Sequence, residues 1–90
     1  MSLTRRLTIC NAKGLHARAS ARFVETVERF DARATVRRDG QSVSGDSIMG
    51  LLMLAAAQGT EIEVSTRGAE AEALMQALAD LVAARFGEEA

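Results

Sequence analysis

The stretch TEIEVSTR, residues 60–67, carries the clearest structural signal in the sequence. Ile62 and Val64 lie between two threonines, and every second residue is charged or polar: Glu61, Glu63, Ser65 and Arg67. This alternation has the period of an extended chain, in which successive side chains point to opposite faces. It predicts a strand with one face buried and one face in water.

The segments on either side of this strand have the period of helices. After Gly68, residues 69–86 predict a helix that Gly87 stops, with an inward stripe of Ala71, Leu74, Leu78, Leu81 and Val82. Before the strand, Ser47 is a suitable N-cap for a short helix that begins at Ile48, and Gly59 ends that segment.

Two further strands and one helix are predicted closer to the N-terminus. Residues 33–44, RATVRRDGQSVS, predict two strands joined by a two-residue hairpin turn at Asp39–Gly40. Residues 3–10 alternate in part and predict another strand. Residues 17–30 predict a helix with a buried stripe of Ala19, Phe23, Val27 and Phe30 and a wet face of Arg18, Arg22, Glu25 and Arg29.

The predicted order is therefore β-α-β-β-α-β-α, which is typical of an α+β fold. The helices should cover one face of a mostly antiparallel sheet, and the other face should carry the polar residues of each strand. Ninety residues fit one domain, residues 1–90, and a hydrophobic fraction of 48% can fill its core.

Composition argues against several classes of function. A net charge of -1, with three Phe and no Trp or Tyr, does not suit a nucleic-acid-binding domain. The lone Cys10 cannot form an internal disulfide and is expected to be a small buried residue at a strand end. The first ten residues lack the apolar core of a signal peptide, and the longest apolar run, IMGLLMLAAA, is about half a membrane span. We therefore expect a cytoplasmic protein with no membrane contact.

The only histidine lies in NAKGLHARAS, residues 11–20, where a loop becomes a helix. No Ser, Thr, Asp or Asn directly precedes Ala17, so the first N–H groups of the helix should face water or an external anion. Arg18 adds a guanidinium that suits phosphate, and His16 adds a nucleophile that is available near neutral pH. Together they suit a phosphoryl group held on an imidazole nitrogen.

Plainer interpretations of this histidine remain open from the residues alone. A lone histidine is more often a surface residue or a hydrogen-bonded core residue than a functional one. A metal site is a poorer interpretation, because there is no second histidine and Cys10 has no CxxC partner. No Ser-His-Asp arrangement can be recognised from the spacing either.

Two segments resemble a known family. GLHARAS, followed by a helix, is similar to the active-site segment of HPr, the histidine-containing phosphocarrier of the bacterial phosphotransferase system. SIMGLLMLAAAQGTEIEV, residues 47–64, is similar to the second family segment, a regulatory serine followed by a short helix and the last strand. The resemblance implies an open-faced β-sandwich, in which a four-stranded antiparallel sheet is covered on one face by three helices.

The resemblance also implies a function. His16 would accept a phosphoryl group from enzyme I, which is charged by phosphoenolpyruvate, and would donate it to an EIIA-type protein, with Arg18 as the electrostatic partner. Such a protein is a carrier rather than a turnover enzyme, it needs no cofactor or metal, and a monomer is the default. The implied partner-docking patch consists of Ala17, Ala21, Ile48, Met49 and Leu52.

Ser47 occupies the position that the HPr kinase/phosphorylase modifies in some members of the family. The residues alone favour capping as the whole role of Ser47, whereas the resemblance adds regulatory phosphorylation as an equal alternative. For Leu51 and Leu54 the plainer interpretation holds, namely that these side chains fill the core.

One departure from the family pattern lies next to the histidine. Ala19 stands where proline is usual, so the first turn of the helix should be looser and one more N–H becomes available. This departure weakens any close match to the sugar-transport members. The alternative is a regulatory adaptor of a nitrogen-related branch that moves no sugar, a possibility that LLMLAAAQG favours. A small nucleic-acid-binding domain is the third candidate.

Overall fold

The structure is a computed structural model that describes residues 2–90. Its elements in chain order are β1 (Ser2–Thr8), α1 (Ala17–Glu28), β2 (Arg33–Arg38), β3 (Gln41–Ser44), α2 (Ile48–Met53), β4 (Glu61–Arg67), α3 (Ala71–Ala83) and a final 3₁₀ turn (Arg85–Gly87). The order of strands and helices is the predicted one. The predicted domain also includes Met1, which lies outside the described residues.

The four strands form one antiparallel sheet in the order β1-β4-β2-β3. The stretch with the clearest alternation, β4, is thus an interior strand. Its Ile62 lies opposite Leu7 of β1, and its Val64 lies opposite Val36 of β2. All four of these side chains are buried, because residues that face each other across paired strands share one face of the sheet.

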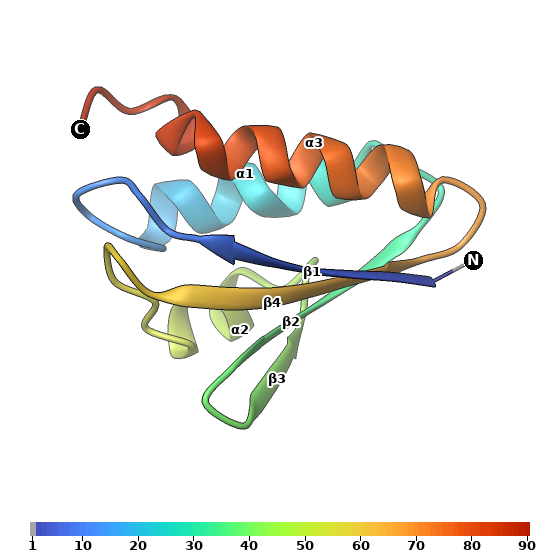
Figure 1. Ribbon diagram of the computed structural model, residues 1–90, viewed down its shortest axis with the longest axis horizontal. Coiled ribbons are helices and arrows are strands. Elements are labelled where there is room, and N and C mark those ends of the chain that lie inside the picture. The colour runs from blue at the N-terminus through green and yellow to red at the C-terminus, as the bar shows by residue number, and fades with distance from the viewer. Residues whose placement is uncertain (1) are drawn as a thin grey trace.

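Three helices cover this apolar face (Figure 1). The long helices α1 and α3 run side by side across it, and the short α2 packs against α1 and β3. The opposite face carries the polar alternates of the strands, among them Thr4, Arg6 and Arg37, which are exposed. This arrangement is the open-faced sandwich that the resemblance implied.

The hairpin between β2 and β3 has the predicted two-residue turn. Arg38 and Gln41 form the last pair of the ladder, and Asp39 and Gly40 have φ angles of 49° and 80°. A type I′ turn requires positive φ at both central residues, and Asp-Gly supplies this at low cost. The prediction is therefore confirmed.

The end of α3 differs from the prediction of a helix over residues 69–86. The helix stops at Ala83, and Arg85 and Phe86 then take positive φ angles of 57° and 54°. The cause is the side chain of Phe86, which is fully buried in the core. A reversal of the chain before Gly87 turns this ring inward, and the gain from burying an aromatic side chain exceeds the cost of two unfavourable backbone angles.

Smaller differences affect other boundaries. Strand β1 ends at Thr8, but hydrogen bonds between Ile9 and residues 59 and 60 continue the pairing. Helix α1 ends at Glu28, and the side chain of Phe30 is only partly buried. Cys10 is partly buried as well, and its thiol donates to the carbonyl of Val82 over 3.2 Å.

Candidate functional site

The loop before α1 is clamped to the segment that follows α2. Leu15 is buried, and its N–H donates to the Ala56 carbonyl over 2.9 Å. Gly14 has a φ of 68°, and a Cβ at this position would lie 2.5 Å from the same carbonyl oxygen. Only glycine combines that backbone angle with so close an approach. The clamp fixes where His16 enters the helix.

The expectation of an uncapped helix start is wrong, because His16 is itself the N-cap of α1. Its backbone is extended, and its Nδ1 accepts a hydrogen bond from the N–H of Arg18 over 3.3 Å. Asparagine, aspartate and serine cap helices in the same way with a side-chain oxygen. The prediction considered only these usual capping residues and not the imidazole nitrogen of a histidine. The distance is long for a hydrogen bond, so the amide is held weakly and can turn to a better acceptor.

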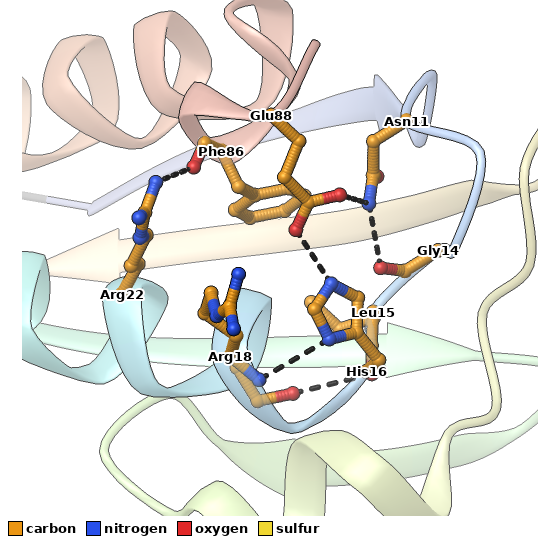
Figure 2. Close-up of polar contacts among 9 residues, drawn as sticks. Asn11, Gly14, Leu15, His16, Arg18, Arg22, Phe86 and Glu88 are labelled. Atoms are coloured by element: carbon orange, nitrogen blue, oxygen red, sulfur yellow. Dashed lines mark hydrogen bonds and ion pairs between the residues drawn. The ribbon is translucent and has the colours of Figure 1, made fainter. Parts of the chain in front are cut away.

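The other ring nitrogen of His16 contacts a residue that sequence reasoning missed. Nε2 lies 2.5 Å from Oε2 of Glu88, and the side chains of the two residues are 27% and 15% exposed. Figure 2 shows Glu88 reaching from the C-terminal segment to the ring. In Figure 1 the C-terminal segment and the loop before α1 lie at the same end of the molecule.

Asn11 supports Glu88 from the other side. Its Nδ2 donates to Oε1 of Glu88 over 3.0 Å and to the Gly14 carbonyl over 2.8 Å (Figure 2). The hydrogen bond from Asn11, followed by the contact with His16, lowers the pKa of the Glu88 carboxyl below its ordinary value, although partial burial opposes this shift. Glu88 is therefore a carboxylate at neutral pH.

The C-terminal segment is held in place by two further contacts. Phe86 is buried in the core, and its carbonyl accepts a hydrogen bond from Nη1 of Arg22 (Figure 2). The helical period predicted Arg22 on the wet face of α1. Arg22 is instead partly buried against the C-terminal segment, because the reversal at Phe86 brings a carbonyl within reach of its guanidinium.

Arg18 is exposed and lines an open hollow of about 370 Å³. Lys13, Arg22 and Glu88 also line this hollow. Glu89 lies there as well, so three cationic and two acidic side chains surround the opening and leave a small excess of positive charge. A larger hollow of about 670 Å³ lies elsewhere, beside Phe30, Arg33 and Arg67, and none of the candidate site residues lines it.

Ser47 is the N-cap of α2, as predicted, and its Oγ accepts from the N–H of Gly50 over 3.0 Å. Next to it, Ile48 and Met49 are 40% and 69% exposed, while Leu51 and Leu54 are buried, as expected. The other members of the expected patch are less uniform: Ala17 is exposed, and Ala21 and Leu52 are partly buried. Sequence reasoning missed Met53, which is 68% exposed.

Residues 2–90 contain neither a cluster of metal ligands nor a membrane-spanning helix. No three His, Cys, Asp or Glu side chains in this range gather closely enough to hold a metal ion. Among the helices of the same range, none has the length and apolar character needed to cross a membrane.

Comparisons with known proteins give one consistent result. A family model described as PTS-HPr, "PTS HPr component phosphorylation site", matches residues 3–84. The chain is 48% identical over 86 residues to phosphocarrier protein HPr of Neisseria meningitidis serogroup A, covering 96% of this chain and 97% of the relative. It is 40% identical over 86 residues to phosphocarrier protein NPr of Shewanella violacea, covering 96% and 94%. The crystal structure of HPr-C-His from Thermoanaerobacter tengcongensis superposes with a TM-score of 0.93 at 38% identity, covering 98% and 99% of the two chains.

Proposed function

Because this chain belongs to the HPr family of phosphocarrier proteins, we propose that His16 accepts a phosphoryl group from phosphoenolpyruvate-charged enzyme I and donates it to an EIIA-type protein. Residues 1–90 would act as one monomeric domain in the cytoplasm. The single observation that supports this proposal best is the position of the His16 ring, partly exposed at the start of α1 with Nδ1 facing the Arg18 amide.

The chemistry follows from that position. The lone pair of Nδ1 attacks phosphorus, the P–N bond to the donor histidine breaks, and its electron pair returns to the donor ring. The Arg18 amide, now weakly bound to Nδ1, can then donate to a phosphoryl oxygen. The positive end of the α1 dipole and the nearby cations stabilise the added charge. The phosphoryl group remains at the surface, where a second protein can take it.

The direct test is incubation with enzyme I and phosphoenolpyruvate, followed by mass analysis. We expect one added phosphoryl group that is lost in acid and kept in alkali, as a phosphoramidate bond requires. It should pass to an added EIIA-type protein. An unmodified chain in the presence of active enzyme I would refute the proposal.

Arg18→Ala should slow phosphoryl acceptance by about tenfold, because a hydrogen bond to a charged group contributes roughly 1.5–3 kcal/mol and Arg18 is exposed. The measurement is the rate of phosphorylation at limiting enzyme I. The matched control is Arg29→Ala, which removes an exposed arginine from the other end of α1. Equal rates for the two variants would remove Arg18 from the site.

Ser47 provides a point of regulation in this proposal. A phosphate there would add about 1.5 to 2 negative charges beside the exposed Ile48 and Met49, where an apolar or acidic partner surface would be repelled. The helix itself would tolerate the charge at its N-terminus. Modification by an HPr kinase/phosphorylase would thus block docking without unfolding the protein.

We expect Ser47→Asp to lose most phosphoryl acceptance while it keeps the fold, because aspartate is also a good N-cap. Ser47→Ala is the control for capping and should lose about 1 kcal/mol of stability but accept phosphate normally. Ser42→Asp is the control for charge, since it adds a carboxylate on the open face of the sheet. Normal transfer to Ser47→Asp would contradict the regulatory role.

A second candidate function is regulation in a nitrogen-related branch, in which the phosphorylation state is the output and no sugar moves. The observation that favours it is the 40% identity to an NPr protein. The carrier site would be the same in both cases. The distinguishing observation is whether the source genome encodes sugar permeases with EIIB and EIIC parts, and their absence would favour regulation.

A further inference from the structure

We propose that Glu88 is a positioning residue that holds the ring proton of His16 on Nε2 and thereby leaves the Nδ1 lone pair as the nucleophile. This inference rests on the function proposed above. It assigns a role to a residue 72 positions away from the histidine in the sequence. It also makes the C-terminal segment part of the phosphoryl site rather than a neighbour of it.

Two independent contacts select the same ring tautomer. A carboxylate oxygen can only accept, so Glu88 requires a proton on Nε2. A backbone N–H can only donate, so Arg18 requires a lone pair on Nδ1. In a neutral imidazole, the hydrogen bond at one nitrogen decides which nitrogen carries the proton. The ring is therefore prepared to react at Nδ1.

The orientation of Glu88 is fixed by a chain of contacts that starts at the backbone. The Gly14 carbonyl can only accept, so it points the Nδ2 end of Asn11 toward itself and toward Oε1 of Glu88. Asn11 is fully buried, and its Oδ1 has no hydrogen-bond partner within residues 2–90. If the Asn11 amide were flipped, its Oδ1 would face the Gly14 carbonyl oxygen, and two acceptors would repel each other. The observed orientation leaves Oδ1 unpaired, but it directs both N–H donors of Asn11 to acceptors, one to Gly14 and one to Glu88.

The charge changes during transfer also favour a carboxylate at Nε2. A neutral ring that attacks phosphorus becomes a phosphoimidazolium with one positive charge, because the proton stays on Nε2. Glu88 stabilises this charge directly, and the charge disappears again when the phosphoryl group leaves. The hydrogen bond from Asn11 and the contact with His16 lower the pKa of Glu88, so the carboxylate is ionised when the ring charge develops.

Glu88→Gln is the sharpest test, because Asn11 would also orient the new amide. Its oxygen would face Nδ2 of Asn11, which directs its NH₂ group toward Nε2 of His16. The NH₂ group of the new glutamine can only donate, so Nε2 of His16 would have to be the acceptor and lose its proton. The ring proton should therefore move to Nδ1, where it would face the N–H of Arg18, a second donor. The matched control is Glu89→Gln, a neighbouring carboxylate that makes no side-chain contact with His16.

The ring tautomer is read from the ¹⁵N shifts of His16 at a pH where the ring is neutral. We expect the Nε2–H form to dominate in the wild type and in Glu89→Gln, and the Nδ1–H form to increase in Glu88→Gln. Phosphoryl acceptance by Glu88→Gln should fall by about tenfold or more, because the wrong ring tautomer then predominates, as when the carboxylate that orients a catalytic histidine is replaced by an amide. Glu88→Ala, which removes the carboxylate without adding a donor, should fall less. Amide spectra verify that each variant is folded.

The outcomes separate this inference from the function on which it rests. A wild-type protein that accepts no phosphoryl group refutes the proposed function, and the tautomer measurement then judges the role of Glu88 alone. If the wild type accepts phosphate and Glu88→Gln matches it in rate and tautomer, only the inference fails. A changed rate with an unchanged tautomer would also overturn it, because Glu88 would then act by contacting enzyme I. A changed tautomer with an unchanged rate would overturn the inference as well, because the tautomer would then not control the reaction.

Discussion

His16→Ala should abolish phosphoryl acceptance and leave the fold intact. The ring supplies the nucleophile of the proposed reaction, and no other histidine exists in the chain to replace it. Its side chain is partly exposed, and it makes one long capping bond and one contact with Glu88 near the chain end, so we expect its loss to cost little stability. Loss of an N-cap costs about 1 kcal/mol, a fraction of the stability of a small domain. The measurements are mass analysis after incubation with charged enzyme I and thermal unfolding of the variant.

His16→Asn separates the two roles of this residue. Asparagine is among the best N-cap residues, so this variant should be at least as stable as His16→Ala. It carries no nucleophilic nitrogen that can hold a phosphoryl group, so it should remain unmodified as well. Acid-labile phosphate on either variant would refute the assignment of His16. Stable phosphate on either variant would indicate a different acceptor, such as Ser47.

Most of the fold could be predicted from periodicity and turn chemistry. The alternation at residues 61–67 identified a strand with one buried face, and Asp39–Gly40 identified the hairpin, because both signals are local. The end of α3 could not be predicted in this way. The helical period continues through residues 84–86, and only the space left in the core decides that Phe86 turns inward.

In the candidate site, too, the residues governed by local rules could be predicted and those that depend on tertiary structure could not. His16 and Ser47 lie at the starts of helices, where short-range rules apply, and the sequence located both. Glu88 and Asn11 have no such signal, since their contacts with the histidine loop depend on how the chain reverses after α3. The prediction of an uncapped start at Ala17 fails for a different reason: the imidazole of His16 acts as the acceptor that the usual capping residues provide.

The reversal at Phe86 links the stability of the fold to the geometry of the site. Phe86 inserts into the core while its carbonyl is bound by Arg22, and Glu88 follows two residues later. We expect the position of the Glu88 carboxylate at Nε2 to depend on the anchoring of the Phe86 ring. A variant that releases this ring should affect both stability and the state of His16.

Phe86→Ala is therefore expected to have the largest effect on stability. Removing a fully buried phenylalanine costs about 3–5 kcal/mol, against roughly 5–15 kcal/mol for the total stability of a domain. The control is Phe30→Ala, a partly buried phenylalanine at the edge of the core, which should cost clearly less. Urea unfolding measures both variants. In the fraction of Phe86→Ala protein that remains folded, Glu88 should be released from His16. The His16 ring should then be a mixture of both tautomers. In Phe30→Ala, the His16 ring should keep the tautomer of the wild type. A strongly destabilised Phe86→Ala with an unchanged tautomer would mean that Asn11 alone holds Glu88 in place, and the link between core and site would be wrong.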